Sequence, residues 1–288
     1  MAETKINLEG WKPKTELGRK VKSGEITNMD EILDNGLKIM ETEIVDYLIP
    51  GIETDFMLIG QAKGKFGGGQ RRLFKQTQKK TAEGNVPSFT TFSVVGNRDG
   101  YIGVALAKGK ETVPARDKSV RLAKLEIIKI RRGCGSWQCN CKTPHSIPFK
   151  VTGKSGSVEI TLIPAPKGTG LCVEKECQKI MKLAGIRDVW SITNGRTKCK
   201  INLIYAAFKA LKQLMEERIM IDDVKNLGIE EGKLPEVVKE KIKTPEELLI
   251  EEKAMLEEEQ ELPELLGDDA IEESGEQTVE EKQDGNKK

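Results

Sequence analysis

The alternation of apolar and polar residues is clearest in the middle of the chain, where it predicts a β-hairpin. Residues 88–96 (SFTTFSVVG) are rich in β-branched and aromatic residues, and residues 101–107 supply a returning strand. Residues 97–100 (NRDG), between them, have the composition of a turn. Three weaker segments precede the hairpin: strands at residues 56–59 and 73–80, and a loop at residues 81–87.

Two helical patterns flank these strands. Residues 28–50 carry an approximate apolar stripe that begins at Asn28, with Glu31 at the capping-box position, while Gly36 leaves two short helices open as an alternative. Residues 112–130 predict a second helix whose apolar face comprises Val113, Val120, Ala123 and Ile127. The order helix, three strands, helix is typical of the small α+β domains that bind double-stranded RNA.

The second half of the chain predicts another α+β domain. Its helices are expected at residues 173–184, where Gly185 follows the last periodic residue, and at residues 200–214. The remaining elements are strands at residues 147–152, 157–163 and 189–193, and a stiff loop at residues 164–170 that comes before the first of these helices.

These elements divide the chain into five parts. The first part is expected to be an extended basic arm, and an ordinary packed N-terminal extension is the alternative. The last part is acidic, with an amphipathic helical pattern at residues 244–258 and disorder expected at residues 269–288. The predicted parts are the arm at residues 1–29, a double-stranded-RNA-binding-like domain at 30–132, a cysteine-rich linker at 133–146, the second α+β domain at 147–214 and an acidic, partly helical or disordered C-terminal tail at 215–288.

The formal net charge of +1 conceals a strong asymmetry. Residues 1–214 contain 37 Lys and Arg against 21 Asp and Glu, a net charge of +16, whereas residues 215–288 contain 10 against 25, a net charge of −15. A cationic body favours a polyanionic partner, because neutralising phosphates releases counterions. Aromatic residues make up only 5% of the chain, which favours recognition of folded RNA by phosphate contact and shape over base stacking.

The sequence argues against a membrane protein and against an enzyme. It has no apolar run long enough to span a bilayer and no secretory signal, so we expect a soluble cytoplasmic protein with no membrane partner. Gly153-Lys154-Ser155 resembles the end of a phosphate-binding loop, but Pro148 stands where that loop needs a glycine. His145 is the only histidine and would have to serve any catalytic pair, so we expect no catalytic residues.

The six cysteines raise the question of a metal site. Cys134, Cys139, Cys141 and His145 have a C-x4-C-x-C-x3-H spacing, which supplies enough ligands for tetrahedral zinc. The spacing differs from the usual C-x2-C, so three reduced cysteines packed in an RNA-facing loop are the alternative. No other cofactor is expected. The remaining cysteines are expected to be small core residues: Cys172, Cys177 and Cys199.

Four stretches of the chain form a dense and ordered set of motifs. They are VVGNRDGYIGVALAKGKETVPAR at residues 94–116, AKLEIIKIRRGCGSW at 123–137, PHSIPFKVTGKSGSVEITLIPAPKGTGL at 144–171 and LAGIRDVWSITNGRTKCKINLIYAAFKAL at 183–211. Together they resemble the universal small-subunit ribosomal protein five family. The cysteine-bearing linker and the N-terminal segment are similar to its archaeal-type branch, which is homologous to the eukaryotic small-subunit protein two.

The resemblance implies a first domain of the double-stranded-RNA-binding type and a second of the left-handed βαβ type, which some enzymes share in fold alone. It also implies a place near the decoding region and the channel through which mRNA enters. The expected partners there are small-subunit rRNA, mRNA and neighbouring small-subunit ribosomal proteins, with an influence on translational accuracy. Two features depart from the family: residues 82–87 form a less basic hairpin tip, and the tail after residue 214 has no family function attached to it.

Lysines and arginines are expected to hold the rRNA by neutralising phosphates, while shape selects the folded RNA. In the loop at residues 164–170, we expect backbone N–H groups to face a phosphate or, alternatively, the loop to pack on a neighbouring protein. The rival interpretations are a free-standing double-stranded-RNA-binding regulator and, more distantly, an enzyme. The candidate RNA contacts are Lys63, Lys65, Arg71, Arg72, Lys75, Lys79, Lys80, Arg98, Lys108, Lys110, Arg131, Arg132 and Lys167.

Overall fold

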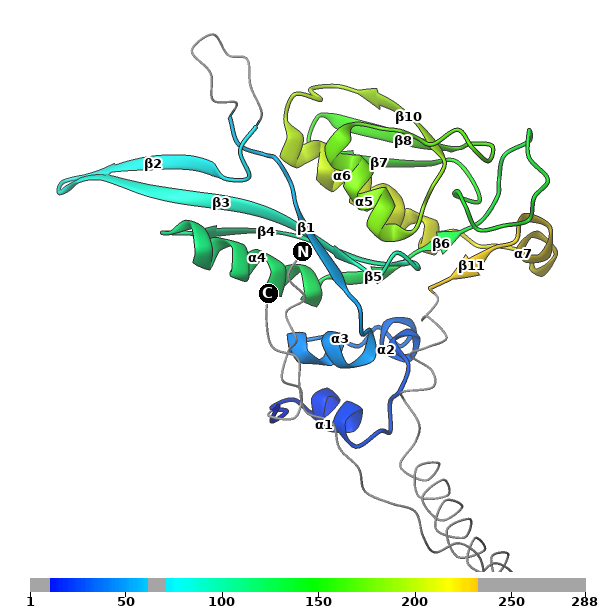
Figure 1. Cartoon of the computed structure of the whole chain (residues 1–288), viewed down its shortest axis with the longest axis horizontal. Coiled ribbons are helices and arrows are strands. Elements are labelled where there is room, and N and C mark those ends of the chain that lie inside the picture. Colours follow the sequence, from blue (N-terminus) through cyan, green and yellow to red (C-terminus); the bar gives the residue numbers. More distant parts are fainter. Residues whose placement is uncertain (1–10, 62–70, 233–288) are drawn as a thin grey trace, which may run out of the picture. The chain divides into compact units, whose positions relative to one another are not determined.

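Two larger β-sheets organise the part of the chain that the structure, a computed structural model, describes: residues 11–61 and 71–232 (Figure 1). The first sheet has the order β1-β3-β4-β5, and β2 also pairs with β3; every neighbouring pair is antiparallel. The expected α+β class is confirmed. The strands of this sheet are β1 (Glu53–Phe56), β2 (Lys75–Thr81), β3 (Gly84–Gly96), β4 (Tyr101–Gly109) and β5 (Ile127–Lys129).

The predicted central hairpin is formed by β3 and β4, but a second hairpin precedes it. β3 starts earlier than expected and pairs with the whole of β2, so the loop predicted at residues 81–87 is wrong. Only Ala82 and Glu83 form the turn. Pro87 is accommodated in β3 because β4 pairs with β3 only from Phe89 onward, which leaves one side of Pro87 without a neighbouring strand. Figure 1 shows the β2–β3 hairpin extending beyond the rest of its sheet.

Helix α4 (Thr112–Leu125) packs on β3 and β4 through small residues. An added Cβ at Gly103 of β4 would lie 2.0 Å from the carbonyl oxygen of Ala123, so the helix approaches the strand closely. The buried face comprises Ala115, Ser119 and Ala123, whereas Val113, expected on that face, is 61% exposed. The helix also ends at Leu125 rather than at Ile130, because the chain turns there into β5.

Residues 11–29 do not form the extended arm that their charge predicted. Helix α1 (Glu16–Lys22) lies in this segment and packs with α2 (Met29–Asp34) and α3 (Thr42–Leu48) in a small apolar cluster. Glu41 accepts hydrogen bonds from Trp11 Nε1 (3.0 Å) and from the backbone N–H of Thr15 (2.6 Å). Residues 11–29 therefore match the alternative of a packed extension, and residues 28–50 form the two short helices that Gly36 left open.

The second sheet has the order β7-β8-β10-β9, and only β9 and β10 run parallel. Because parallel neighbours need a crossover, α5 connects β9 to β10. Helix α6 packs on β7 and β8 so closely that an added Cβ at Gly153 would lie 2.0 Å from the Ala206 carbonyl oxygen. The elements are β7 (Val151–Ser155), β8 (Val158–Pro164), β9 (Leu171–Cys172), α5 (Lys175–Ala184), β10 (Val189–Asn194) and α6 (Lys200–Glu216).

Helix α5 joins the two sheets through one apolar core. Its residues share a cluster with residues of the first sheet: Cys177, Ile180 and Met181 from α5, with Phe92 from β3 and Val104 from β4. The amine of Lys179 also donates to the carbonyl oxygen of Phe56 at the end of β1 (2.6 Å). The linker predicted at residues 133–146 therefore separates two sheets along the chain but does not separate two cores.

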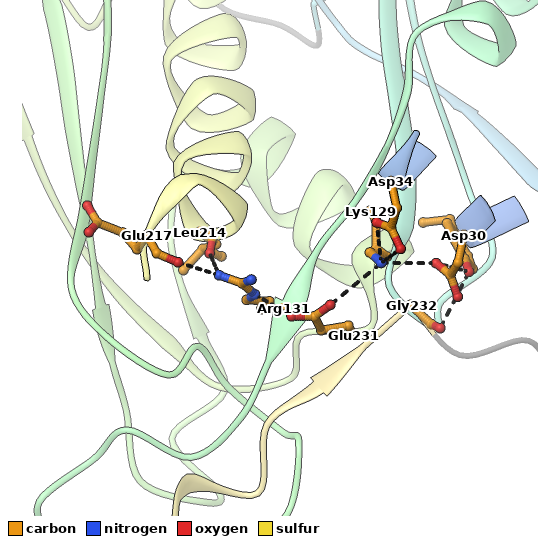
Figure 2. A network of polar contacts seen from close by, with 9 residues as sticks. Asp30, Asp34, Lys129, Arg131, Leu214, Glu217, Glu231 and Gly232 are labelled. Atoms are coloured by element: carbon orange, nitrogen blue, oxygen red, sulfur yellow. Dashed lines mark hydrogen bonds and ion pairs between the residues drawn. The ribbon is translucent and has the colours of Figure 1, made fainter. Parts of the chain in front are cut away.

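Residues 217–232, here called the strap, return to the folded body although the sequence placed them in the acidic tail. They contain α7 (Ile221–Leu227) and β11 (Glu230–Glu231), and β11 pairs antiparallel with β6 (Arg131–Arg132). Figure 2 shows Arg131 between the end of α6 and β11. Its guanidinium donates to the carbonyl oxygens of Leu214 (3.1 Å) and Glu217 (2.6 Å) and to the carboxylate of Glu231 (2.5 Å).

Lys129 ties the strap to the N-terminal helices. Its amine lies 2.8 Å from Asp34, 3.4 Å from Asp30 and 3.5 Å from Glu231 (Figure 2). Burial opposes the charged form, but the hydrogen bond to Asp34 and the three carboxylates hold the pKa of Lys129 above its usual value. The helix predicted at residues 244–258 lies outside the described residues, and none of the described helices is long and apolar enough to cross a membrane.

Candidate metal centre and cationic surface

The four predicted metal ligands meet at one point close to β6. The Sγ atoms of Cys134, Cys139 and Cys141 and a ring nitrogen of His145 all lie within 4.8 Å of one another. In a tetrahedral zinc site with Zn–S and Zn–N distances of about 2.3 and 2.0 Å, ligand atoms lie roughly 3.5–3.8 Å apart. Movements of about 1 Å would therefore bring these atoms around one ion, and three sulfur atoms with one imidazole are donors that suit zinc.

Backbone pairing brings these ligands together. An isolated β-bridge joins Gly133 to Ser146 and so places Cys134 beside His145. At Gly135 an added Cβ would lie 1.8 Å from the carbonyl oxygen of Pro148, so only glycine fits there. The N–H of Cys134 also donates to the carbonyl oxygen of Leu227 in the strap (2.8 Å). The first and last ligands are therefore held by the fold itself.

Hydrogen bonds favour a thiolate at one edge of this cluster. Burial opposes ionisation of Cys141, but the hydroxyl of Thr143 (Oγ1 to Sγ 3.1 Å), its backbone N–H and the neighbouring thiols lower the pKa of Cys141 to about 6. Burial raises the pKa of Cys134 to about 11, and its hydrogen bond with Cys141 adds to this. Because the thiolate is the form that binds metal, Cys141 is prepared to act as a ligand.

Asp188 orients the histidine of the cluster. The side chains of His145 and Asp188 are only 6% exposed, and Nδ1 of His145 lies 2.8 Å from Oδ2 of Asp188. The other ring nitrogen, Nε2, is 4.0 Å from Sγ of Cys139. A carboxylate on one imidazole nitrogen, with the second nitrogen turned to the ligand site, is the usual arrangement around metal-binding histidines.

The three cysteines outside the cluster have different surroundings. Cys177 is buried in the core as expected, and burial raises the pKa of its thiol to about 12. Cys172 is exposed on β9 and Cys199 is half-buried before α6, so the expectation of a core position is wrong for Cys172 and holds only in part for Cys199.

Several predicted RNA contacts lie on the β2–β3 hairpin and beside it. Every residue of β2 is exposed, including Lys75, Lys79 and Lys80. Thr90 of β3 lies opposite Lys75 on one side and opposite Lys108 of β4 on the other, so these two lysines point to the same face of the sheet. Lys108 and Lys110 are both exposed at the end of β4. Lys63 and Lys65 lie outside the described residues.

A cleft of about 730 Å³ opens between the start of β2 and the start of α6. Among its lining residues, Arg71, Arg72 and Lys198 form no ion pair with any carboxylate of the described residues. Lys200 contacts Glu174 at 2.7 Å. Lys198 and Lys200 were not among the predicted contacts, although the Lys-Cys-Lys stretch at a predicted helix start was a signal for them. Cations line this cleft from both sides: Arg71, Arg72 and Lys75 from the β2 side, Lys198 and Lys200 from the α6 side.

A second cleft, of about 980 Å³, lies beside the cysteine cluster and is lined by cations and carboxylates together. Arg98 and Lys167, both predicted contacts, take part in its lining. The side chain of Arg98 is 64% exposed and donates to Glu53 (2.7 Å). Lys182 and Arg187, which were not among the predicted contacts, are exposed on the same cleft.

The loop at residues 164–170 does not present its backbone as expected. The N–H groups of Gly168 and Gly170 donate to Oδ1 of Asp188 at 3.1 and 2.7 Å, and that of Thr169 donates to the carbonyl oxygen of Pro166. The prediction that these groups face a phosphate is therefore wrong, because an internal carboxylate occupies the same donors. The side chain of Lys167 remains exposed.

Arg131 and Arg132 direct their charges into the protein. Arg131 contacts the strap as described above, and the side chain of Arg132 is only 7% exposed. The guanidinium of Arg132 donates to the carbonyl oxygens of Arg98 (3.4 Å) and Asp99 (3.2 Å) and lies 3.9 Å from the carboxylate of Glu230. Burial lowers the pKa of Arg132. These two predicted RNA contacts already have partners within the fold.

The fold and these surfaces define an α+β protein with an exposed cationic face, a class suited to binding polyanions. Residues 73–131 match the family profile described as "Ribosomal protein S5, N-terminal domain", and residues 153–223 match "Ribosomal protein S5, C-terminal domain". A protein of Nanoarchaeum equitans named "Small ribosomal subunit protein uS5" is 48% identical over 80% of this chain and 98% of its own length. Proteins of the same name are 46% identical in Methanosphaera stadtmanae (78% of this chain, 92% of the relative) and 44% identical in Methanocaldococcus jannaschii (80% and 99%).

The chain belongs to the ribosomal protein S5 family. The resemblance predicted from its motifs, including the archaeal-type branch, is thereby confirmed, and so is the expectation of a structural protein that is not an enzyme. Membership of a non-enzymatic family also argues against a catalytic interpretation of the contacts that run from Cys139 to His145 and from His145 to Asp188. The same three residue types serve as a catalytic triad in some hydrolases. Here Cys134 and Cys141 lie at the same point, as they would in a metal centre.

Proposed function

We propose that this protein is a structural component of the small ribosomal subunit and binds rRNA through the β2–β3 hairpin and the 730 Å³ cleft at its base. The observation that carries the proposal is the cleft itself, since exposed cations line it from the β2 side and from the segment just before α6. Membership of the ribosomal protein S5 family supplies the class of partner.

The physical basis is phosphate neutralisation on a rigid frame. Each phosphate that is neutralised releases counterions and adds to affinity without reading sequence. Selectivity for folded RNA then requires that the cations keep their spacing. The shared core supports this, because Phe92 of β3, the strand that pairs with β2, packs in the same apolar cluster as Leu203 and Ile204 of α6. The two sides of the cleft are therefore connected through one core.

Finer features of the family are also proposed for this chain. The first sheet backed by α4 supports a domain like those that bind double-stranded RNA, and the β9-α5-β10 crossover supports a left-handed βαβ unit. We place the hairpin near the decoding region and near mRNA as it enters, in a cytoplasmic ribosome. Neighbouring small-subunit proteins are proposed as further partners. The alternative remains a free-standing RNA-binding regulator.

Sedimentation separates these two functions. Full-length protein expressed with an affinity tag in a related archaeon should co-migrate with small subunits at moderate salt. A charge-reversed variant of the cleft, Arg71→Glu with Lys198→Glu, should move toward the top of the gradient. Wild-type protein that stays at the top while still binding duplex RNA would favour the regulator.

We further propose that Cys134, Cys139, Cys141 and His145 hold one zinc ion with a structural role. Support comes from the meeting of four suitable ligand atoms within 4.8 Å and from the hydrogen bond between His145 and Asp188. A closed set of four protein ligands is typical of structural zinc, which contributes directly to folding. The zinc would stabilise the segment between the two sheets.

Elemental analysis of protein purified without chelator tests this proposal, with about one zinc per chain expected. Changing Cys139→Ser together with Cys141→Ser should abolish zinc binding and lower the unfolding temperature, because hydroxyls bind zinc far less well than thiolates. Cys172→Ser with Cys199→Ser is the matched control, since it removes two cysteines outside the cluster and should retain the metal. A wild-type protein without zinc would refute the metal centre.

A further inference from the structure

One buried carboxylate connects the cysteine–histidine cluster to the loop at residues 164–170. Oδ2 of Asp188 lies 2.8 Å from Nδ1 of His145. Oδ1 accepts hydrogen bonds from the backbone N–H groups of Gly168 and Gly170, at 3.1 and 2.7 Å. Asp188 is only 5% exposed. Its two oxygens therefore serve two different segments, one that carries a metal ligand and one that carries the exposed Lys167.

The glycines of this loop are adapted to Asp188. Gly168 has φ +91° and Gly170 has φ +74°, conformations that other residues rarely adopt. No atom lies within 4 Å of an added Cβ at either position, so backbone conformation and not space explains the glycines. With these angles, two N–H groups converge on one oxygen as they do in backbone anion sites. The carboxylate of Asp188 thus holds the loop in the shape that is observed.

We propose that Asp188 is a positioning residue that couples metal binding at the cluster to the conformation of the loop at residues 164–170. The inference rests on the proposed zinc centre. When Nε2 of His145 binds a metal, its proton must reside on Nδ1, so Nδ1–H donates to Asp188. The metal therefore fixes one tautomer of His145 and strengthens its hydrogen bond to the same carboxylate that holds Gly168 and Gly170.

The backbone around Asp188 keeps the two segments adjacent, so the coupling needs no large movement. The N–H groups of Arg187 and Asp188 donate to the carbonyl oxygen of His145 at 2.8 and 3.1 Å. The hydroxyl of Ser146 donates to the carbonyl oxygen of Asp188 (2.5 Å) and accepts from the N–H of Ala165 (3.3 Å). These bonds do not involve the Asp188 side chain, so a variant at this position retains a framework for folding.

Coupling of this kind acts in both directions. If the metal stabilises the loop, an ordered loop must raise the affinity for the metal by the same factor. Lys167 lies between Pro166 and Gly168, so its position depends on the loop that Asp188 holds. The metal centre would thereby influence a cation of the second cleft without touching RNA.

Asp188→Asn is the variant that replaces one of the two acceptor oxygens with a donor group. Asparagine has one acceptor oxygen and one NH₂ group, so it can accept from His145 or from the two glycines but not from both sides. The matched control is Asp99→Asn, the same chemical change on the same cleft, where the carboxylate lies 3.7 Å from Arg132 and does not contact His145. Each protein is measured zinc-loaded and zinc-stripped, with circular dichroism to confirm folding.

Three measurements report on the coupling. Amide hydrogen exchange at Gly168 and Gly170 should become about tenfold faster when zinc is removed from the wild type. Asp188→Asn should bind zinc about 10–100-fold more weakly in chelator competition and exchange these amides rapidly even when loaded. Cobalt(II) in place of zinc should show a shifted absorption spectrum in Asp188→Asn, a change that a loss of stability alone does not cause.

The outcomes distinguish the coupling from the metal centre. Wild-type zinc content with unchanged exchange at Gly168 and Gly170 after stripping overturns the coupling and leaves the centre intact. Asp188→Asn with wild-type zinc affinity and cobalt spectrum does the same. A chain that binds no zinc at all overturns both. Asp99→Asn should match the wild type in every measurement, and a loss of zinc affinity in that variant as large as in Asp188→Asn would show that Asp188 has no special position.

Discussion

The chain contains two pairs of consecutive arginines, Arg71-Arg72 and Arg131-Arg132, which the sequence does not distinguish. Arg71 and Arg72 are exposed on a cleft, and no carboxylate of the described residues pairs with them. Arg131 and Arg132 bind backbone carbonyl oxygens and the carboxylates of the strap. Positive charge in a cationic protein therefore has two uses, and only the fold shows which residue has which.

The difference has a physical cause in the hydration of each pair. A buried guanidinium has lost its water and needs hydrogen-bond acceptors inside the protein, so its contacts contribute to the free energy of folding. An exposed guanidinium keeps its water and remains available to a phosphate. Substitutions of Arg131 and Arg132 should consequently change stability, and those of Arg71 and Arg72 should change RNA affinity. Four predictions, from the largest expected effect to the smallest, test this separation.

Arg131→Ala with Arg132→Ala is expected to lower the free energy of unfolding by about 2–4 kcal/mol, because it removes two largely enclosed guanidinium groups and their hydrogen bonds, and hydrogen bonds to charged groups contribute about 1.5–3 kcal/mol each. The strap should also lose its connection to the end of α6. Urea unfolding followed by circular dichroism measures the change. If stability is unaffected while the salt dependence of RNA binding falls, the assignment of this pair to the fold is wrong.

Arg71→Gln with Arg72→Gln is the converse experiment, in which RNA affinity and not stability should change. The urea midpoint should stay close to that of the wild type. The slope of log affinity for structured rRNA against log salt should become shallower by about 1.4–1.8, which corresponds to two phosphates. Filter binding over a range of salt concentrations measures the slope, and the Arg131-Arg132 variant, assayed where it is folded, serves as the control. An unchanged slope would remove this pair from the RNA surface.

Much of the fold could be predicted because local patterns agreed with the tertiary structure. The β3–β4 hairpin, α5 and α6 were all expected, and Gly185 ends α5 in the left-handed conformation (φ 83°) as its position predicted. The prediction failed where tertiary contacts, and not local sequence, determine the position of a segment. The N-terminal segment has basic residues typical of an arm, yet Val21 packs in an apolar cluster. The strap is acidic, yet it provides the partners of buried cations.

The residues of the cysteine–histidine cluster could be predicted from the sequence, but the contacts that hold them in place could not. Spacing alone indicated the ligands, because cysteine and histidine have few other uses at such density. Nothing local linked His145 to Asp188, since 43 residues separate them and only the fold places them together. For the same reason the sequence suggested a phosphate for the N–H groups of Gly168 and Gly170, when an internal anion was available.

Substitutions in the hairpin should change translational accuracy more than assembly. Lys79→Gln with Lys80→Gln alters side chains that are exposed along β2, so subunits should form normally. Stop-codon and near-cognate misreading should change severalfold in reporter strains, if the hairpin lies near the decoding region as proposed. Lys154→Gln, an exposed lysine of β7 that is 3.5 Å from Glu159, is the control. Unchanged misreading in assembled subunits would count against this placement.

The smallest expected effect concerns the acidic residues beyond the strap. Residues 233–288 contain 8 Lys and Arg against 19 Asp and Glu, a net charge of −11, while the basic surface remains exposed on the body. Exposed charges attract weakly in pairs, but many pairs at low salt add up, so this segment could shield the body from non-specific RNA. A tail that is only solvated is the alternative.

Deleting residues 233–288 should raise the affinity for random RNA a few-fold at low salt and much less at physiological salt, because screening removes the competing attraction. The deletion must begin after Gly232, since a truncation at residue 220 would also remove α7 and β11 and confuse shielding with stability. A full-length variant with the glutamates of residues 233–288 changed to glutamine controls for chain length. It should bind random RNA as the deletion does, because charge and not bulk is the proposed cause. Equal binding by all three proteins at low salt would contradict the shield, and incorporation into subunits should be the same for each.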